Sequence, residues 1–350
     1  MTDLSTPLYP MLFEPIYKQK VWGGRRLEQL GRPLPGDANM PIGESWELAD
    51  LSASSPDGGG GGQQCSIIAN GPLAGETLHD LIGAFGPRLM GQLTLDESGQ
   101  FPLLVKFLDA SANLSVQVHP SQAYLDAHPH AVAHLKSEAW YIVAAEPGSV
   151  IYKGVRAGVT PEQFRAAIDD ESLETLLLKV PVKAGNCHYL PSGMCHALGA
   201  GVLVAEIQTP SDTTFRVYDW GRPEESNRSL HIDEAMQCID VPSPDTAANE
   251  KRTHLAGMFT TMSRLITCEH FQIEKVRMSQ GYAQPVPYDQ PTVWVVLEGK
   301  GVIDPGGGAR PVEFSHGQTL LLPAQMAEPT VELTMDTVWL EITKRVVARN

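Results

Sequence analysis

The sequence lacks long apolar runs and is poor in basic residues. None of its 350 residues belongs to a run approaching the roughly 20 consecutive apolar residues of a membrane-spanning helix. Lysine and arginine number 26 against 41 aspartates and glutamates, so the formal net charge is −15. Because nucleic acids and anionic membranes require a basic surface, neither is expected as a partner. A small anionic ligand is still allowed, since it needs only a few local cations.

Cysteine is also scarce, and its pattern excludes a disulfide framework. The five cysteines are odd in number, scattered, and without a CxxC pair: Cys65, Cys187, Cys195, Cys238 and Cys268. Such a pattern indicates reduced thiols. The first residues, MTDLSTPLYP, show no basic segment followed by an apolar core, so no secretory signal is predicted. We therefore expect a cytoplasmic protein, and no obligate protein partner is evident.

Glycine and proline, by contrast, are frequent, with 32 and 27 residues. Between them recur short apolar runs of strand length, such as FPLLVKFLDA, EAWYIVAA, GVLVAEIQT and PTVWVVLEGKGVI. Runs of this length bounded by turn residues are typical of β-strands. The sequence therefore predicts a mainly β fold, either a sandwich or a barrel.

Helical patterns are confined to three segments in the N-terminal half, at about 76–91, 120–135 and 160–178. The third has the strongest start signal, with Thr160 as N-cap, Pro161 at the first helical position and Gln163 at the third. We expect these segments to be helical insertions in the β framework.

The chain also contains an internal repeat. Trp140 and Trp294 each belong to a strand–turn–strand unit, which continues with a glycine, five residues and a proline: Gly185-NCHYL-Pro191 and Gly317-QTLLL-Pro323. The first copy is longer by 22 residues, nearly the length of the helical segment that begins at Thr160. The two copies therefore predict two similar β units, with a boundary near the polar segment 243–257.

Polar side chains alternate with valines in NLSVQVHPS, residues 113–121. Because successive side chains on a strand point to opposite faces, Ser115, Gln117 and His119 share one face. Further along, GNCHYLPSGMCHALG fits the glycine–five–proline–x–glycine–two–histidine pattern of cupin barrels. That spacing places His196 on a strand that points into the barrel, and Glu138 stands just before the Trp140 strand.

Two imidazoles, one carboxylate and one amide oxygen make a compatible ligand set for one divalent metal: Gln117, His119, Glu138 and His196. Zn²⁺ accepts nitrogen and oxygen ligands, so one Zn²⁺ per chain is expected. The second copy keeps the frame but has Glu328 in place of the histidine and Thr292 in place of the glutamate. It is expected to be metal-free.

The expected fold is thus two cupin-like jelly-roll β-barrels in tandem. Residues 1–250 would form a catalytic cupin domain that carries the helical insertions. Residues 251–350 would form a metal-free cupin-like barrel.

With these residues identified, the chain resembles the type I mannose-6-phosphate isomerases over nearly its whole length. The resemblance is carried by KVWGG (20–24), GESWELAD (43–50), FPLLVKFLDA (101–110), LSVQVHP (114–120), KSEAWY (136–141), CHALG (195–199) and EIQTPSDTTFRVYDWGR (206–222). Two departures place it nearer the short bacterial form. Leu198 stands where longer members often carry a tyrosine, and their extended helical domain is missing.

The resemblance implies a zinc-dependent aldose–ketose isomerase that interconverts mannose 6-phosphate and fructose 6-phosphate through a cis-enediol. It implies the same four zinc ligands, and it assigns Trp22, Lys106, Lys136 and Arg216 to the substrate site. With the residues added from strand alternation and from the surrounding motif, the catalytic candidates are Arg216, Glu206 and Lys136. The substrate-binding candidates are Trp22, Lys106, Ser115 and Asp212.

Several alternatives stay open at this point. Lys136 could face solvent, Arg216 could merely pair with Asp212, Glu206 could be a structural carboxylate, and Trp22 could be ordinary packing. The proton carrier could be Glu206, a histidine, a lysine or metal-bound water. Two other function classes also fit the pattern, a non-catalytic sugar-binding cupin and an Fe-dependent cupin oxidase.

Overall fold

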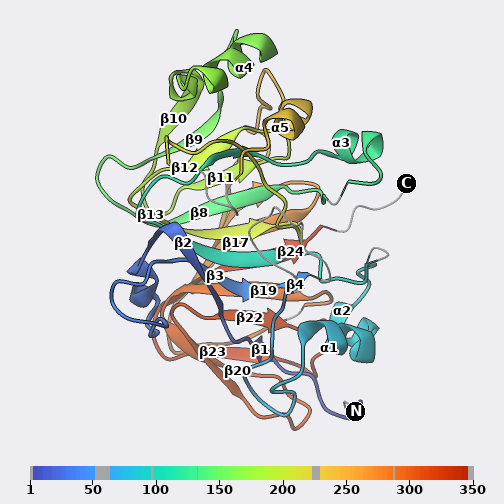
Figure 1. The fold of residues 1–350 in the computed structure, drawn as a ribbon. Coiled ribbons are helices and arrows are strands. Elements are labelled where there is room, and N and C mark those ends of the chain that lie inside the picture. The colour runs from blue at the N-terminus through green and yellow to red at the C-terminus, as the bar shows by residue number, and fades with distance from the viewer. Residues whose placement is uncertain are drawn as a thin grey trace.

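The structure is a computed structural model that describes residues 3–51, 64–95, 98–131, 133–222, 229–286 and 288–345. Most of its regular structure is β-strand, so the predicted mainly β class is confirmed. The strands form four larger antiparallel sheets, stacked on one another in Figure 1, and one small pair of Asp50–Leu51 (β4) with Gln64–Cys65 (β5).

The N-terminal half builds two sheets that face each other. The six-stranded sheet has the order β11-β8-β13-β6-β2-β3, with the bounds Cys187–Leu190, Glu138–Ala145, Val202–Gln208, Leu104–Ala110, Ile16–Gly24 and Ile42–Leu48. The five-stranded sheet has the order β10-β9-β12-β7-β14, with the bounds Leu177–Pro181, Val150–Val155, His196–Leu198, Val116–Val118 and Phe215–Tyr218. Trp140, Ile151 and Leu198 belong to the apolar cluster between these sheets.

The C-terminal half repeats this arrangement. The seven-stranded sheet has the order β1-β22-β19-β24-β17-β16-β15, with the bounds Met11–Leu12, Thr319–Leu322, Thr292–Glu298, Thr337–Lys344, Phe271–Met278, Thr260–Thr267 and Thr253–Ala256. The four-stranded sheet has the order β18-β23-β20-β21, with the bounds Ala283–Pro285, Thr330–Leu333, Lys300–Asp304 and Val312–Ser315. Trp294, Ile303 and Trp339 fill the space between them.

The two halves share a core where the six- and seven-stranded sheets pack face to face. Phe107 and Ile207 from the former belong to one buried cluster with Val293 and Ile342 from the latter. Figure 1 shows the resulting order of layers, with the five-stranded sheet uppermost and the four-stranded sheet at the bottom. In the described residues each half consists of two open facing sheets, so closure into tandem barrels is not confirmed.

The division at residue 250 stays a prediction. Two observations complicate it. Strand β1, from the N-terminus, pairs with β22 of the C-terminal half. The segment 243–257, predicted as the boundary, contains the whole of strand β15, which forms the edge of the seven-stranded sheet.

Helices lie in all three predicted segments but are shorter than predicted. They are Leu78–Phe85 (α1), Pro87–Met90 (α2), Gln122–Ala127 (α3) and Pro161–Asp169 (α4), followed by the 3₁₀ helix Leu173–Leu176 (η2). The predicted capping box of Thr160 and Gln163 is confirmed at the start of α4. The helix Ile232–Cys238 (α5) and the 3₁₀ helix Arg26–Leu30 (η1) were not predicted. No helix in the described ranges has the length and apolar character needed to cross a membrane.

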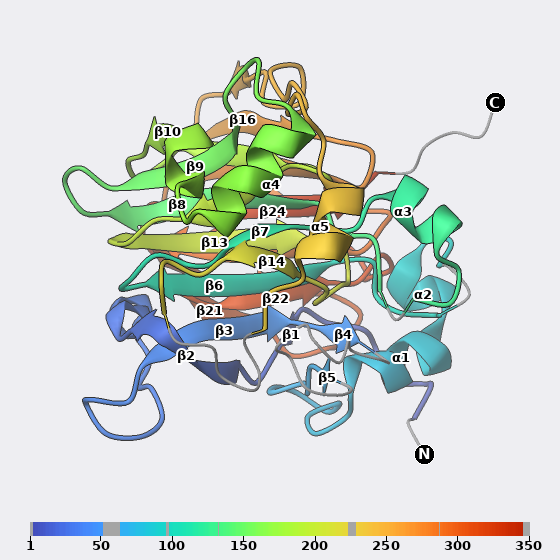
Figure 2. The same cartoon turned by 45° about the horizontal axis from the view of Figure 1, so that its top comes forward.

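Helices α4 and α5 cover the outer face of the five-stranded sheet (Figure 2). Phe164 of α4 and Ala235 of α5 belong to one buried cluster with Val116 and Val217 of the sheet. The valines of β7 and β14 therefore face the helices, and the residues between them face the interior of the N-terminal half.

Strand register supports the internal repeat. Equivalent residues of the two copies have equivalent partners: Trp140 opposite Glu206, Trp294 opposite Glu341, Glu138 opposite Leu190, and Thr292 opposite Leu322. Gly185 and Gly317 open the corresponding turns with φ angles of 87° and 80°, a backbone region that glycine enters without strain.

Candidate active site and metal centre

Strand β7 positions Gln117, one of the predicted ligands, and His119 follows directly after it. The position of β7 between β12 and β14 puts Gln117 opposite His196 on one side and opposite Arg216 on the other. Because the two valines of β7 pack outward beneath the helices, Gln117 points inward. The sequence-derived inward face of residues 115–119 is therefore confirmed.

The facing wall comes from the six-stranded sheet. Lys106 on β6, Glu206 on β13 and Trp140 on β8 lie side by side in one cross-strand row. Their neighbours Phe107 and Ala205 point into the core shared by the two halves. Lys106 and Glu206 must therefore point the other way, toward β7.

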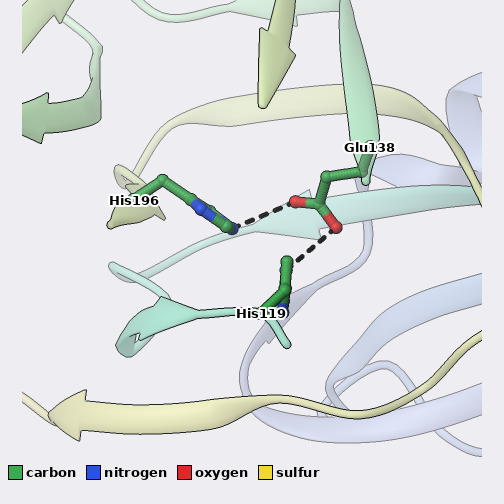
Figure 3. A group of neighbouring side chains, drawn as sticks. All are labelled: His119, Glu138 and His196. Atoms are coloured by element: carbon green, nitrogen blue, oxygen red, sulfur yellow. Dashed lines mark ion pairs between the residues drawn. The ribbon is translucent and has the colours of Figure 1, made fainter. Parts of the chain in front are cut away.

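His119, Glu138 and His196 converge between these two walls (Figure 3). All three are fully buried. Nε2 of His119 lies 3.2 Å from Oε2 of Glu138, and Nε2 of His196 lies 3.1 Å from Oε1. Despite these short distances, neither oxygen of Glu138 and neither ring nitrogen of His119 has a hydrogen-bond partner. Buried polar atoms without partners are costly, so the three side chains are arranged for a shared ligand.

The protonation states fit a cation in this position. The Nδ1 of His196 is 2.8 Å from the carbonyl oxygen of Met194, so in the neutral ring Nδ1 donates to this oxygen and the lone pair lies on Nε2, on the side of Glu138. Burial lowers the pKa of His119 to about 3, so this ring is neutral as well. Although burial opposes its ionisation, Glu138 keeps a pKa well below its usual range, and the largest favourable cause is the charge of Lys136. Two neutral imidazoles and one carboxylate can hold a single divalent metal ion.

Gln117, the fourth predicted ligand, lies next to this cluster. Its Nε2 is 3.2 Å from Nε2 of His196. The amide oxygen and nitrogen exchange places on a half-turn of the terminal torsion, and the oxygen then faces the same point. Its ligand role stays a prediction that the position allows.

A cleft of about 170 Å³ lies beside this cluster, and two of its lining residues, Gln117 and Lys136, contact the cluster. Among its lining residues are all of the predicted catalytic and substrate-binding side chains: Trp22, Lys106, Ser115, Lys136, Glu206, Asp212 and Arg216. Lys136 is only 4% exposed, and its Nζ lies 3.1 Å from Oε2 of Glu138, so the solvent-facing alternative for this lysine is wrong. Trp22 both lines the cleft and packs in the core cluster beneath it.

Glu206 and Lys106 form a buried ion pair in the cleft, with 3.3 Å between Oε1 and Nζ. The other oxygen of Glu206 accepts a hydrogen bond from Nε1 of Trp140 at 2.9 Å. Burial and the nearby Glu138 raise the pKa of Glu206. A carboxylate that is held in place and binds a proton more strongly than usual can act as a general base.

Hydrogen bonds to Ser115 and Ser229 hold the guanidinium of Arg216 in place. Its Nε donates to Oγ of Ser115 at 2.9 Å, and the Ser115 hydroxyl donates in turn to Oδ1 of Asp219 at 2.6 Å. Nη1 of Arg216 also donates to the carbonyl oxygen of Ser229 at 2.9 Å. Ser115 therefore bridges a carboxylate to the guanidinium, which orients the arginine at the edge of the cleft.

Sequence reasoning assigned no role to Lys20, Glu44 and Trp46, which form part of the cleft wall. Nζ of Lys20 lies 3.0 Å from Oε1 of Glu44, and Nε1 of Trp46 donates to Oε2 of Glu44 at 2.7 Å. Although burial opposes ionisation, the charges of Lys20 and Lys106 lower the pKa of Glu44 to about 2. The available signal was the alternation in GESWELAD, which puts Glu44 and Trp46 on one face of a strand.

In the second copy the corresponding positions do not come together. Thr292 is fully buried in β19, whereas Glu328 is exposed. Among the described residues, the His119, Glu138 and His196 group is the set of metal-binding side-chain types that lies close enough to hold an ion. That the second copy binds no metal stays a prediction.

Comparison with known proteins agrees with this geometry. Residues 11–144 match the family model of the phosphomannose isomerase type I catalytic domain. The chain is 34% identical over 326 residues to the mannose-6-phosphate isomerase ManA of Bacillus subtilis, covering 92% of this chain and 96% of that protein. The crystal structure of the mannose 6-phosphate isomerase from Bacillus subtilis has a TM-score of 0.80 at 28% identity, covering 96% of this chain and 99% of that one.

A more distant structure, described as a zinc-bound mannose 6-phosphate isomerase, has the same fold. Its TM-score is 0.69 at 15% identity, and the match covers 96% of this chain and all of that one. Three findings indicate the same family: the buried cluster of two histidines and a glutamate, the cleft beside it, and 34% sequence identity over 92% of this chain. This chain is a member of the type I phosphomannose isomerase family.

Proposed function

We propose that the protein is a metal-dependent isomerase that interconverts mannose 6-phosphate and fructose 6-phosphate. The observation that carries this proposal is the convergence of His119, Glu138 and His196 beside a cleft that is lined by Glu206 and Arg216. Family membership supplies the substrate, because the related proteins are named for it.

His119, Glu138 and His196, with Gln117 as the fourth, would hold the metal. The mixed nitrogen and oxygen donors suit Zn²⁺. When bound, such an ion supplies a positive charge that polarises a carbonyl group and favours the oxyanion that develops beside it. One ion per chain is expected.

The reaction moves one proton between C2 of the aldose and C1 of the ketose. We assign this transfer to Glu206, whose carboxylate takes the proton from C2 and returns it to C1 of the cis-enediol. A hydroxyl proton passes from O2 to O1 in the same cycle, so atoms and charge balance. Lys106 and Trp140 hold the carboxylate in one orientation, and its raised pKa makes it a stronger base.

The remaining predicted residues surround the substrate. Arg216 contributes positive charge to the anionic parts of the substrate, oriented by Ser115. Lys136 lies beside Glu138, so its charge acts at the reacting end of the substrate. Trp22 and Asp212 shape the cleft and offer an apolar face and a hydrogen-bond acceptor for the sugar hydroxyls.

The two alternative functions gain nothing from the comparisons. The related proteins are isomerases by name, which favours neither an oxidase nor a non-catalytic sugar-binding protein. We also propose the cytoplasm as the compartment, supported by the free thiols of all five cysteines.

A coupled assay tests the proposal. Purified protein should convert mannose 6-phosphate into fructose 6-phosphate, and dialysis against a strong chelator should abolish the conversion until Zn²⁺ is returned. Oxygen uptake with Fe²⁺ and the same sugar phosphate is the matched control for the oxidase. Absence of turnover in the metal-loaded protein contradicts the proposal, as does oxygen consumption coupled to loss of substrate.

A further inference from the structure

The cations of the cleft differ in how far they are buried. The side chains of Lys106 and Lys136 are 7% and 5% exposed, and each is in contact with a carboxylate of the reacting centre. The side chain of Lys20 is 18% exposed and contacts Glu44 on a strand farther from the metal cluster. The cleft therefore has two buried cations beside the proposed chemistry and a third, Lys20, that is more exposed to solvent.

The substrate of the proposed function has two ends. Its reacting carbons are C1 and C2, and its phosphate is attached to C6. If C1 and C2 lie beside Glu206 and the metal ligands, the phosphate lies at the opposite end of the chain of carbons. Lys136, at 3.1 Å from a metal-ligand oxygen of Glu138, lies too close to the chemistry to hold that phosphate. Lys106, whose Nζ lies 3.3 Å from Oε1 of Glu206, is already paired with the proposed base.

Lys20 lines the cleft from β2, a strand that carries none of the predicted metal ligands. Two strand steps separate β2 from β13, which carries Glu206, because β6 lies between them and pairs with both. Strand β14, which carries Arg216, is the edge strand of the facing five-stranded sheet. Lys20 and Arg216 therefore line the cleft from the two facing sheets, Arg216 from an edge strand and Lys20 from the strand next to the edge strand β3.

We propose that Lys20 binds the phosphate of the substrate, and that Glu44 is the internal anion that competes with this phosphate for the lysine. This inference rests on the proposed function for the identity of the ligand, a hexose 6-phosphate. An ammonium group 3.0 Å from a carboxylate is held in place before the substrate arrives. A phosphate dianion offers it a stronger charge-assisted partner.

Glu44 is suited to act as the competing anion because Trp46 holds its carboxylate in the cleft wall independently of Lys20. Its other oxygen accepts the indole hydrogen bond of Trp46, and Trp46 is flanked by the ammonium groups of Lys18 and Lys106 at 4.9 and 4.8 Å from the ring centroid. The carboxylate is therefore anchored, whereas Lys20 is a long and partly exposed side chain. Arrival of the phosphate changes the partner of the lysine and leaves the wall intact.

The experiment measures binding of a phosphate ligand that cannot react. The probe is the open-chain alditol phosphate obtained by reducing the carbonyl of mannose 6-phosphate, titrated calorimetrically into the full-length protein. Lys20→Met should weaken its binding about tenfold to a hundredfold, the range for loss of a hydrogen bond to a charged group. Glu44→Gln should act in the opposite direction and tighten binding, because the competing anion is removed.

Lys18→Met is the matched control. It removes one positive charge from the same strand, two residues away, and Lys18 bonds to Oε1 of Gln64 and does not line the cleft. It should leave the affinity for the probe close to that of the wild type. Lys20→Arg should restore most of the affinity lost in Lys20→Met, which a merely structural role does not predict.

Kinetics supply a second measurement. In Lys20→Met the KM for mannose 6-phosphate should rise and kcat should change little, while kcat/KM for unphosphorylated mannose stays at the wild-type value. Wild-type affinity for the probe in Lys20→Met overturns the inference, as does equal weakening by Lys18→Met. If the wild type does not isomerise mannose 6-phosphate but binds the probe through Lys20, the proposed function fails and the phosphate site stands.

Discussion

Gln117 and His196 lie directly opposite each other on neighbouring antiparallel strands, with 3.2 Å between their Nε2 atoms. The same strand position puts Arg216 on the other side of Gln117. A slip of one residue along β7 would turn Gln117 toward the outer helices and away from His196 and Arg216. The packing of Val116 and Val118 against those helices therefore also sets the geometry of the site.

Replacing a metal ligand should remove the metal and spare the fold. In His196→Ala, bound metal after dialysis should fall well below one ion per chain, because a structural or catalytic site needs several convergent ligands. His188→Ala, a histidine of the same sandwich outside the cluster, is the control and should keep its metal. Full metal content in both His119→Ala and His196→Ala, by elemental analysis, contradicts the assignment.

Arg216→Ala should damage turnover without damaging the protein. We expect kcat to fall by about two decades, the scale for loss of one donor to a developing negative charge. Metal content and melting temperature should stay close to wild type. Arg222→Ala is the control. Arg222 donates to Asp219 at 2.6 Å, the same carboxylate that accepts from Ser115, but it does not line the cleft. A normal kcat in Arg216→Ala means that the arginine is only structural.

Glu44 should make the stability of the protein depend on acid pH. Its pKa falls from 4.5 in the unfolded chain to about 2 in the fold, so the ionised carboxylate favours folding above pH 4.5. The ionised carboxylate contributes about 3 kcal/mol to the free energy of unfolding, and this contribution is lost as the pH falls from 4.5 toward 2. The gap in unfolding free energy between wild type and Glu44→Gln should therefore shrink across that range, measured by denaturant titration.

Glu328→Gln serves as the control for this measurement. Glu328 is exposed, so its replacement should change the unfolding free energy by no more than about 0.5 kcal/mol. A gap for Glu44→Gln that is constant from pH 6 to pH 3 would show that the carboxylate does not depend on Lys20 and Lys106 for its stability.

The second copy should hold no metal. Glu328→Gln is expected to leave both metal content and turnover unchanged, because a single carboxylate does not make a metal site. Elemental analysis of the intact protein should give one tightly bound ion per chain. Two ions per chain, with one lost in Glu328→Gln, would contradict the interpretation of the repeat.

The shared core should make the two halves unfold together. Leu340 of β24 is fully buried in the cluster that joins the six- and seven-stranded sheets. Leu340→Ala should lower the free energy of unfolding by about 2–5 kcal/mol and destabilise both halves in a single transition.

Deleting residues 257–350 should expose the face of the six-stranded sheet that packs on the second half, and should cause aggregation. A soluble truncated protein that keeps its metal would show that the first half folds alone.

Much of the metal cluster could be predicted because its residues stand in short motifs with a strand period. Gln117 and His119 alternate with valines, and His196 follows the glycine and proline frame at a fixed spacing. Lys20 and Glu44 could not be assigned in this way. Their roles depend on β2 and β3 lying beside β6, a pairing between segments far apart in the sequence that no local pattern specifies.

The limits of the fold prediction have a similar cause. The segment 243–257 is polar, so it was predicted as a linker, yet β15 pairs with β16 through an exposed edge that needs no apolar residues. Two-residue strand β1 gives no periodicity at all, and its pairing with β22 is visible only in the folded chain. The helical segments were located correctly, but their ends depend on strands such as β10 that begin within them.

The matching register of Glu206 and Glu341 has a consequence for how new activities could be built on this protein. Both carboxylates lie opposite a tryptophan, but the neighbouring strand offers Lys106 to the first and Glu274 to the second. The same strand arrangement thus occurs twice in one chain, once with the predicted metal ligands and once without them. The second copy is a site for engineering that already has the matching strand register, and its interior is an apolar cluster separate from the one inside the first half.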